Sequence, residues 1–188
     1  MRLVLLGPPG AGKGTQAKEI SVRLEVPAIS TGDIFRSHVS AGTALGLEAA
    51  AYLDSGRYVP DDVTNAMVRD RLREPDADKG FLLDGYPRTV AQVAELDAML
   101  AEQGDALDAV VELVVAADEL VSRLGSRARL EGRSDDADEV ARRRLALYTE
   151  ETAPLAAVYA DRGLLRQVDG MGSVEEVTAR VLEAIADA

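Results

Sequence analysis

The stretch from Gly7 to Thr15, which reads GPPGAGKGT, has the residue types of a phosphate-binding loop. Gly7, Gly12 and Lys13 keep the spacing of the pattern G-x-x-x-x-G-K-[ST], in which backbone N–H groups surround phosphate oxygens and a hydroxyl holds Mg²⁺. The position after the lysine is Gly14, however, and the first hydroxyl belongs to Thr15. Glycines also make tight strand-to-helix turns without a ligand, but the correctly spaced lysine favours a polyphosphate site.

A second stretch, GFLLDGYPR from Gly80 to Arg88, places Asp84 at the end of an apolar run. Ligands of parallel α/β sheets lie at the carboxyl ends of the strands, so we expect Asp84 at the same edge as the glycine loop. Magnesium keeps much of its hydration shell and needs few carboxylates. Asp84 could therefore hold the metal, directly or through water, although an Asp-Gly pair before Pro87 also fits a simple turn.

Two further stretches combine hydroxyls, carboxylates and arginines. In ISTGDIFR, from Ile29 to Arg36, the first polar residues suit a helix N-terminus, and Arg36 would add a phosphate clamp. A cluster of arginines follows later in the chain, at Arg123, Arg127, Arg129, Arg133, Arg142, Arg143 and Arg144. Such runs usually form a solvated helix face, yet arginine also suits bidentate phosphate contacts. In a chain this acidic, the concentration favours an anion site.

Short apolar runs alternate with longer amphipathic segments along the chain. The apolar runs predict buried strands at residues 3–6, 28–30, 81–83, 110–115 and 164–168. The amphipathic segments predict helices at 13–24, 60–73, 90–103, 117–126, 138–161 and 174–186. This alternation indicates a parallel α/β sheet. Pro154 predicts a kink or break in the long fifth helix, and residues 31–59 are expected to form a small appended helical subdomain.

Composition limits the classes of protein that this chain can represent. The 188 residues suit one domain, and a formal charge of −12 argues against a nucleic-acid binder. The chain has no cysteine, which excludes disulfides and thiolate metal sites. No apolar run approaches membrane-spanning length, and the N-terminus shows no signal segment. We therefore expect a cytoplasmic protein that acts as a monomer, without a membrane partner.

The motifs together resemble the adenylate kinase family of nucleoside monophosphate kinases. The resemblance rests on GPPGAGKGT at Gly7, STGD at Ser30, DGYPR at Asp84 with Gln92 following, GRSDD at Gly132, and RRRL at Arg142. It covers nearly the whole chain. It implies a three-layer P-loop NTPase fold with a five-stranded parallel sheet, a core of residues 1–29, 60–125 and 137–188, an NMP-binding subdomain at 30–59 and a short lid loop at 126–136.

The resemblance also implies a role for each matching residue. ATP would be bound by Gly10, Ala11, Gly12, Lys13, Gly14, Thr15, Arg123, Arg127 and Gly172. AMP would be bound by Thr31, Arg36, Arg57, Tyr58, Val59, Gly85, Tyr86, Pro87, Arg88, Gln92, Arg133 and Arg144. The residues acting on the transferring phosphate would be Lys13, Arg88, Arg127, Arg133 and Arg144. Asp84 would organise Mg²⁺ through water, while Asp135 and Asp136 would orient the lid arginines.

The implied reaction is the reversible, Mg²⁺-dependent transfer of the terminal phosphoryl group of ATP to AMP, which gives two ADP and balances adenine nucleotides. A monophosphate is already largely ionised near neutral pH, so the reaction needs no general base. The difficulty is repulsion between two polyanions, which positioning and charge neutralisation must overcome. Closure of the lid and the subdomain would exclude water, which competes with AMP as acceptor.

Two alternatives remain open at this stage. A short lid without cysteine excludes a zinc-bearing lid, but short lids also occur in relatives that phosphorylate UMP and CMP. Thr31 and Gln92 match the AMP-specific pattern, since an amide can pair with an adenine edge, so AMP is the preferred acceptor over UMP, CMP or a broad range. A P-loop nucleotide switch is the remote alternative, and it leaves Thr31, Arg36, Arg88 and Gln92 without a role.

Overall fold

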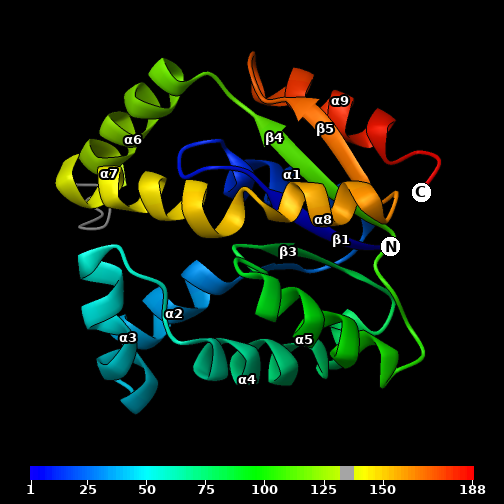
Figure 1. Cartoon of the computed structure of the whole chain (residues 1–188), viewed down its shortest axis with the longest axis horizontal. Coiled ribbons are helices and arrows are strands. Elements are labelled where there is room, and N and C mark those ends of the chain that lie inside the picture. The colour runs from blue at the N-terminus through cyan, green and yellow to red at the C-terminus, as the bar shows by residue number, and fades with distance from the viewer. Residues whose placement is uncertain (132–137) are drawn as a thin grey trace.

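The computed structural model of the chain describes residues 1–131 and 138–188, and the side chains of residues 1–126 and 139–188. Its centre is a five-stranded sheet in the order β2-β3-β1-β4-β5 (Figure 1). The strands are β1 (Arg2–Leu6), β2 (Ala28–Ser30), β3 (Phe81–Asp84), β4 (Ala109–Val114) and β5 (Leu165–Asp169). Every neighbouring pair is parallel, so the carboxyl ends of all five strands lie at one edge. The predicted parallel sheet is confirmed.

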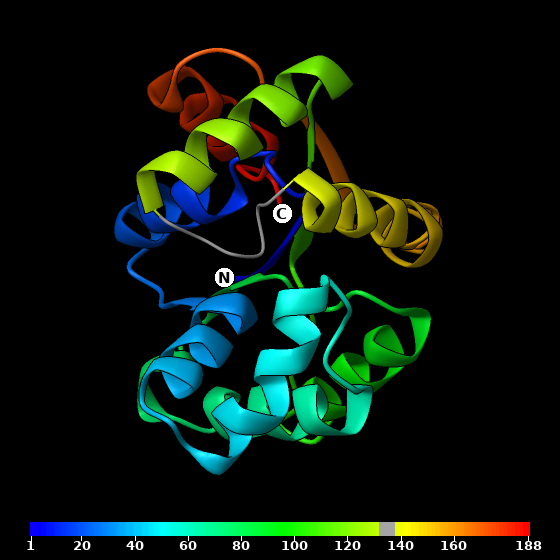
Figure 2. The ribbon, with the colours of Figure 1, turned by 90° about the vertical axis from the view of Figure 1, so that its left-hand side faces the viewer.

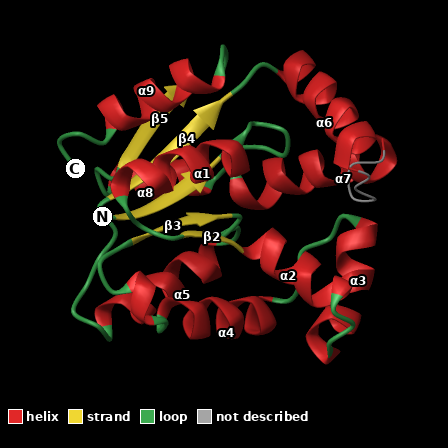
Figure 3. Cartoon of the chain, turned by 180° about the vertical axis from the view of Figure 1, so that it is seen from behind, coloured by secondary structure: helices red, strands yellow, loops and turns green. Residues whose placement is uncertain are grey.

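Helices cover both faces of this sheet (Figure 3). On one face lie α1 (Lys13–Leu24), α6 (Ala117–Glu131) and α9 (Val174–Ala184), and on the other lie α4 (Asp61–Leu72), α5 (Val90–Ala101) and α8 (Leu155–Asp161). Strand β1 shows why two layers form: Leu3 and Leu5 pack with the first set of helices, whereas Val4 and Leu6 pack with the second. Alternate side chains of a strand point to opposite faces, so a strand with four consecutive apolar residues, such as residues 3–6, requires cover on both faces. A short 3₁₀ turn, η1 (Pro75–Ala77), precedes β3.

The segment inserted after β2 forms two helices, α2 (Thr31–Ser40) and α3 (Ala44–Ser55). Each begins at a hydroxyl cap: Ser30 Oγ accepts from Asp33 N, and Thr43 Oγ1 accepts from Gly46 N. Phe35, Ala49 and Val59 form a small apolar cluster of their own, apart from the two clusters of the main sheet. Figure 2 shows this helical pair at the bottom of the molecule and α6 near its top.

The long C-terminal helical region is broken where the sequence predicts it. Helix α7 (Asp138–Leu147) passes into a π-helical turn, η3 (Tyr148–Thr152), and α8 begins after Pro154. Ala153 N donates to Tyr148 O at 2.8 Å, which is a bond across five residues. Proline has no N–H and its ring crowds the preceding turn, so a wider turn accommodates it. The predicted break at Pro154 is confirmed, and the π turn extends it toward α7.

Helix α6 differs from its prediction. It continues to Glu131, past the predicted end at Ser126, so the expected loop conformation is wrong for residues 126–131, while their role in a lid stays a prediction. Ala, Arg, Leu and Glu, which follow Ser126, are strong helix formers, and no glycine occurs before Gly132. The rest of the predicted lid, residues 132–136, lies outside the described residues. Within the described residues, no helix combines the length and apolar character needed to cross a membrane.

Candidate active site

The glycine loop joins β1 to α1 at the carboxyl edge of the sheet. Gly12 is the N-cap of α1 with φ +92°, a left-handed conformation that side chains disfavour, and Lys13 is the first helical residue. The unpaired N–H groups of the first turn therefore point out of the end of the sheet, where they can meet an anion. Lys13 Nζ donates to Gly7 O at 2.7 Å and to Pro8 O at 3.1 Å, so its ammonium group lies over the loop.

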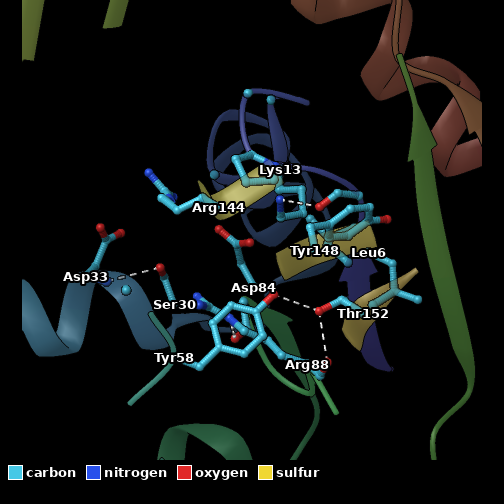
Figure 4. Close-up of a pocket in the computed structure, with 18 of the residues that line it drawn as sticks. Leu6, Lys13, Ser30, Asp33, Tyr58, Asp84, Arg88, Arg144, Tyr148 and Thr152 are labelled. Carbon is cyan, nitrogen blue, oxygen red and sulfur yellow. Dashed lines mark hydrogen bonds between the residues drawn. The ribbon is translucent and has the colours of Figure 1, made fainter. Parts of the chain in front are cut away.

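A cavity of about 390 Å³ opens at this edge (Figure 4). Among the described residues that line it, seven carry a positive charge and two a negative charge. The cations are Lys13, Lys18, Arg36, Arg57, Arg88, Arg123 and Arg144, and the carboxylates are Asp33 and Asp84. In a protein with a net charge of −12, this reversal of sign concentrates a positive potential in one hollow. The cavity suits a polyanion.

Asp84 ends β3 and lies directly beside the start of α1. A Cβ atom built on Gly14 would stand 3.6 Å from Asp84 Oδ2, which is ordinary contact, and Gly14 has no left-handed φ. Neither packing nor backbone conformation therefore requires glycine there. A side chain at position 14 would instead enter the space between the helix start and the carboxylate. That space adjoins Lys13 and Thr15, so Asp84 is placed to hold a divalent cation against phosphate oxygens.

Arg88 is fixed at the opposite wall by several contacts. Its Nε donates to Gly85 O at 2.6 Å, and its backbone N donates to Gln92 Oε1 at 2.7 Å. Its guanidinium stacks over the ring of Tyr58, with 4.8 Å between Cζ and the ring centroid. Within the described part of the chain, no carboxylate pairs with Arg88. A cation that is held rigidly without a counter-charge is suited to bind an anionic substrate.

Gly85 allows the close packing around Arg88. It has φ +81°, and a Cβ there would stand 2.9 Å from Thr31 Oγ1 and 3.0 Å from Arg88 Nη2. The Thr31 hydroxyl donates to Gly85 O at 2.9 Å. The turn DGYPR therefore brings the first residue of α2 and the guanidinium of Arg88 to one carbonyl group.

Several residues expected to bind AMP do not line the cavity. Thr31, Val59, Tyr86 and Gln92 are buried within the protein. The Gln92 amide is engaged on both sides, because Oε1 accepts from Arg88 N and Nε2 donates to Asp61 Oδ1 at 2.7 Å. Its pairing with an adenine edge remains a prediction, and in this structure Gln92 supports the Arg88 backbone. The Tyr86 hydroxyl donates to Asn65 Oδ1 at 2.8 Å, and burial raises its pKa.

The remaining predicted AMP residues that the structure describes lie at the cavity, while Arg133 lies outside the described residues. Arg36 pairs with Asp33 on α2, and Arg57 stacks over Tyr52 at 5.0 Å. Tyr58, Gly85, Pro87 and Arg144 also line it. The acceptor side of the site is therefore built from both ends of the inserted helical pair, the DGYPR turn and α7.

Arg123 connects the glycine loop to the loop after β5. Its Nε pairs with Glu119 Oε1 at 2.7 Å, and its Nη2 donates to Gly170 O at 3.2 Å. Its Nη1 reaches Ala11 O at 3.5 Å. Among the predicted ATP residues, Gly10, Gly12, Lys13, Gly14, Thr15 and Arg123 line the cavity, whereas Ala11 and Gly172 do not. The side chains of Arg127, Arg133, Asp135 and Asp136 lie outside the described residues.

Sequence reasoning missed the wall contributed by the π turn. Tyr148 and Thr152 both line the cavity, and Thr152 Oγ1 donates to Arg88 O at 2.8 Å. Burial raises the pKa of the Tyr148 phenol, which therefore stays neutral near pH 7. The only signal for these residues is their place just before Pro154, because a helix that must widen ahead of a proline turns residues toward new neighbours.

The described residues contain no cluster of three or more histidines, aspartates or glutamates that could hold a metal alone. A magnesium ion here would rely on Asp84, water and the phosphates of a nucleotide. That donor set fits Mg²⁺, which binds through one or two carboxylates and substrate phosphates and keeps several waters.

The site combines a parallel sheet, a glycine loop that leads into a helix, a lysine at the start of that helix, and an acidic residue at the end of the adjacent strand. These features define a P-loop phosphotransfer protein. The family model for adenylate kinase matches residues 5–164. An adenylate kinase of Nocardioides sp. is 62% identical over 98% of this chain and 97% of its own length. Adenylate kinases of Thermobifida fusca (57%) and Kocuria rhizophila (58%) match over 98% of both chains. The chain belongs to the adenylate kinase family, a family of phosphotransferases with a phosphate group as acceptor.

Proposed function

We propose that this protein catalyses the reversible, Mg²⁺-dependent transfer of the terminal phosphoryl group of ATP to AMP, giving two molecules of ADP. The observation that carries the proposal is that one cavity, lined by described residues, joins two cationic walls. Lys13 and Arg123 lie with the glycine loop, while Arg36, Arg57 and Arg88 lie with the inserted helices and the DGYPR turn. A donor and an acceptor, both polyanions, would meet between these walls.

Each wall has its own task in this proposal. The N–H groups at the start of α1, with Lys13, bind the phosphates of the donor. Arg88 and Arg36 hold the acceptor phosphate and offset its repulsion of the donor, since transfer depends on alignment and charge neutralisation. A magnesium ion held by Asp84, directly or through water, would neutralise charge on the donor phosphates. Arg127, Arg133 and Arg144 complete the charge balance in the proposal.

No side chain is needed as a base, because the attacking atom is an oxygen of an ionised phosphate. Water is the competing acceptor. The inserted helices and the region from Ser126 to residue 136 are proposed to act as the NMP-binding subdomain and the lid, respectively, and to exclude water when they close.

The experiment is to mix the purified protein with ATP, MgCl₂ and each of AMP, UMP, CMP and GMP, and to measure ADP and the new diphosphate. We expect AMP to be preferred. Equal turnover with UMP or CMP would replace the AMP assignment by a broad or pyrimidine monophosphate kinase. If folded protein forms ADP at the same slow rate with and without any monophosphate, the kinase proposal fails and a hydrolytic nucleotide switch replaces it.

We also propose that the protein acts as a cytoplasmic monomer on free nucleotides, without nucleic acid or membrane. One chain supplies both walls of the cavity, so the reaction needs no residue from a second copy. The net charge of −12 opposes binding to nucleic acid. Light scattering after size-exclusion chromatography tests the oligomeric state directly.

A further inference from the structure

The segment that leads from α3 back to the sheet contacts Arg88 through Tyr58. The ring of Tyr58 stacks against the Arg88 guanidinium, with 4.8 Å between Cζ and the ring centroid, and the two side chains overlap in Figure 4. A guanidinium over a tyrosine face is attracted by the negative face of the ring, and the ring restricts its position without neutralising its charge. Tyr58 therefore differs from a carboxylate partner, which would compete with a substrate phosphate.

The hydroxyl of Tyr58 continues this contact to the main chain of Arg88. Thr152 Oγ1 lies 2.8 Å from Arg88 O and 2.9 Å from Tyr58 Oη. A carbonyl oxygen can only accept, so the single proton of Thr152 must go to Arg88 O. Tyr58 Oη must then donate to Thr152 Oγ1. The two hydrogen bonds therefore run from Tyr58 Oη to Thr152 Oγ1 and from Thr152 Oγ1 to Arg88 O.

These two hydrogen bonds connect three separate parts of the fold. Tyr58 belongs to the segment that leaves the inserted helices, Thr152 to the π turn, and Arg88 to the turn after β3. The same segment is anchored to α7, because Arg143 Nη1 donates to Ser55 O at 3.0 Å. Thr152 is only 5% exposed, so its two hydrogen bonds are shielded from competing water.

We propose that Tyr58 and Thr152 are positioning residues for Arg88. The Tyr58 ring restricts the position of the guanidinium, and the Thr152 hydroxyl fixes the backbone through its hydrogen bond to Arg88 O. Together they keep the cation in one position relative to the transferring phosphate. The inference rests on the proposed phosphoryl transfer to AMP. Small displacements of a group that binds the reacting atoms reduce rate steeply, so loss of either contact should lower turnover without removing the charge.

Four variants separate the two contacts. Tyr58→Phe removes the hydroxyl and keeps the ring, Tyr58→Leu removes both, Thr152→Val removes the hydroxyl at constant shape, and Thr152→Ser keeps it. We expect kcat with AMP to fall about tenfold or more for Thr152→Val and Tyr58→Leu, and less for Tyr58→Phe. Thr152→Ser should restore most of the rate. The KM for ATP should not change, because neither residue touches the glycine loop.

Matched controls remove similar hydroxyls elsewhere. Thr149→Val deletes a hydroxyl on the same helical region, which donates to Leu145 O at 3.0 Å, and Tyr159→Phe deletes a buried phenol hydroxyl. Both should keep the wild-type kcat. In an Arg88→Ala background, Thr152→Val should cause no further loss, because the residue it positions is gone.

A measurement without nucleotide separates this inference from the kinase proposal. Arg88 Nε–H donates to Gly85 O, with 2.6 Å between the nitrogen and the oxygen. The exchange of this proton with solvent can be followed by NMR, after its signal has been assigned by comparison with Arg88→Lys. We expect exchange to be several-fold faster in Thr152→Val and Tyr58→Leu and unchanged in Thr149→Val. Unchanged exchange and unchanged kcat would overturn the positioning role. A wild-type protein without AMP-dependent turnover would overturn the proposed function, while the exchange result would still decide whether these residues hold Arg88.

Discussion

At the scale of single residues, the site depends on a few cations held by neutral groups. Arg88 has hydrogen bonds to backbone oxygen and to an amide, and a ring beneath its guanidinium. Because none of these partners carries a negative charge, the full charge of the guanidinium faces the cavity. The geometry explains why an acidic protein can still bind two polyanions.

The first prediction concerns this cation. Arg88→Ala should lower kcat for AMP phosphorylation by about 10²-fold or more, since removal of one well-placed donor to a developing charge has that effect in other enzymes. Steady-state kinetics provide the measurement. The thermal midpoint of Arg88→Ala should stay near that of the wild type. The control is Arg162→Ala, which removes an arginine that stacks on Tyr159 and pairs with Asp97, and which should keep the wild-type kcat. Near-normal turnover of Arg88→Ala would remove Arg88 from the mechanism.

The second prediction concerns the metal. Asp84→Asn keeps the shape of the side chain but removes its charge, so the Mg²⁺ concentration for half-maximal activity should rise about 10- to 100-fold, as expected when a carboxylate that orients a metal or its waters is lost. A titration with MgCl₂ at fixed nucleotide measures this. Asp33→Asn, at the other wall of the cavity, should leave the Mg²⁺ concentration for half-maximal activity unchanged. An unchanged Mg²⁺ concentration in Asp84→Asn would contradict the assignment of Asp84 to the metal.

At the scale of elements, the caps and breaks of helices decide where side chains reach the site. Helix α9 begins with a capping box, in which Ser173 Oγ accepts from Glu176 N and Glu176 Oε2 accepts from Ser173 N at 2.8 Å. The bonds from Ser173 lower the pKa of Glu176 below its usual value of 4.5. This helix start follows the Gly172 loop, where the base of ATP is predicted to bind.

A pH experiment tests the capping box. A carboxylate with a lowered pKa in the folded state stabilises the fold above its ordinary pKa, and that contribution is lost as pH falls through the lower, folded value. Glu176→Gln should therefore lower the thermal midpoint at pH 7, and the difference from wild type should shrink as the pH falls below 4.5 toward the lower, folded pKa. Glu175→Gln removes the neighbouring charge without the cap and should show a smaller difference at pH 7. Equal effects of the two variants would contradict the role of the cap.

Helix α8 carries a buried phenol that lacks a partner. Tyr159 is fully buried, and its Oη is the buried side-chain atom that has no hydrogen bond among the described residues. An unsatisfied buried hydroxyl costs stability, so Tyr159→Phe should raise the free energy of unfolding by up to about 1 kcal/mol. Tyr86→Phe loses a bond to Asn65 and should lower it by about 1 kcal/mol. Urea unfolding measures both. A comparable loss in both variants would show that Tyr159 Oη has a partner.

At the scale of the whole molecule, a net charge of −12 surrounds a cavity lined mainly by cations. Surface carboxylates keep the protein soluble and oppose the binding of extended polyanions, while the cavity concentrates the positive charge where nucleotide phosphates fit. The two walls come from distant parts of the sequence, and the sheet edge brings them together.

Ligand-dependent stability tests this arrangement without turnover. A ligand that binds only the folded state stabilises it by RT ln(1 + [L]/Kd), which is about 2.7 kcal/mol at 100 times Kd. We expect AMP alone to raise the thermal midpoint more than UMP or CMP at the same concentration. Arg36→Ala should reduce the shift with AMP while leaving the shift with ATP. Equal shifts with all three monophosphates would contradict selection of adenine.

Much of the fold follows from local pattern. The strands, most helix boundaries and the break at Pro154 are predicted from the sequence because apolar runs, caps and proline act through neighbouring residues. The predicted end of α6 at Ser126 is wrong, because the helix formers after Ser126 carry the helix on to Glu131. The side chains beyond Ser126 in the lid region stay predictions.

The sequence by itself determined the class of chemistry: the GPPGAGKGT spacing, Asp84 after an apolar strand and the arginines point to phosphoryl transfer because each residue type has few other uses in that order. Only the tertiary structure decided which residues share the cavity. It turned Gln92 toward Asp61 and Arg88, and it brought Tyr58 and Thr152, 94 positions apart, to one arginine: Tyr58 to its guanidinium and Thr152 to its backbone carbonyl. Contacts between distant segments depend on how helices pack on a sheet, and local sequence patterns do not predict that packing.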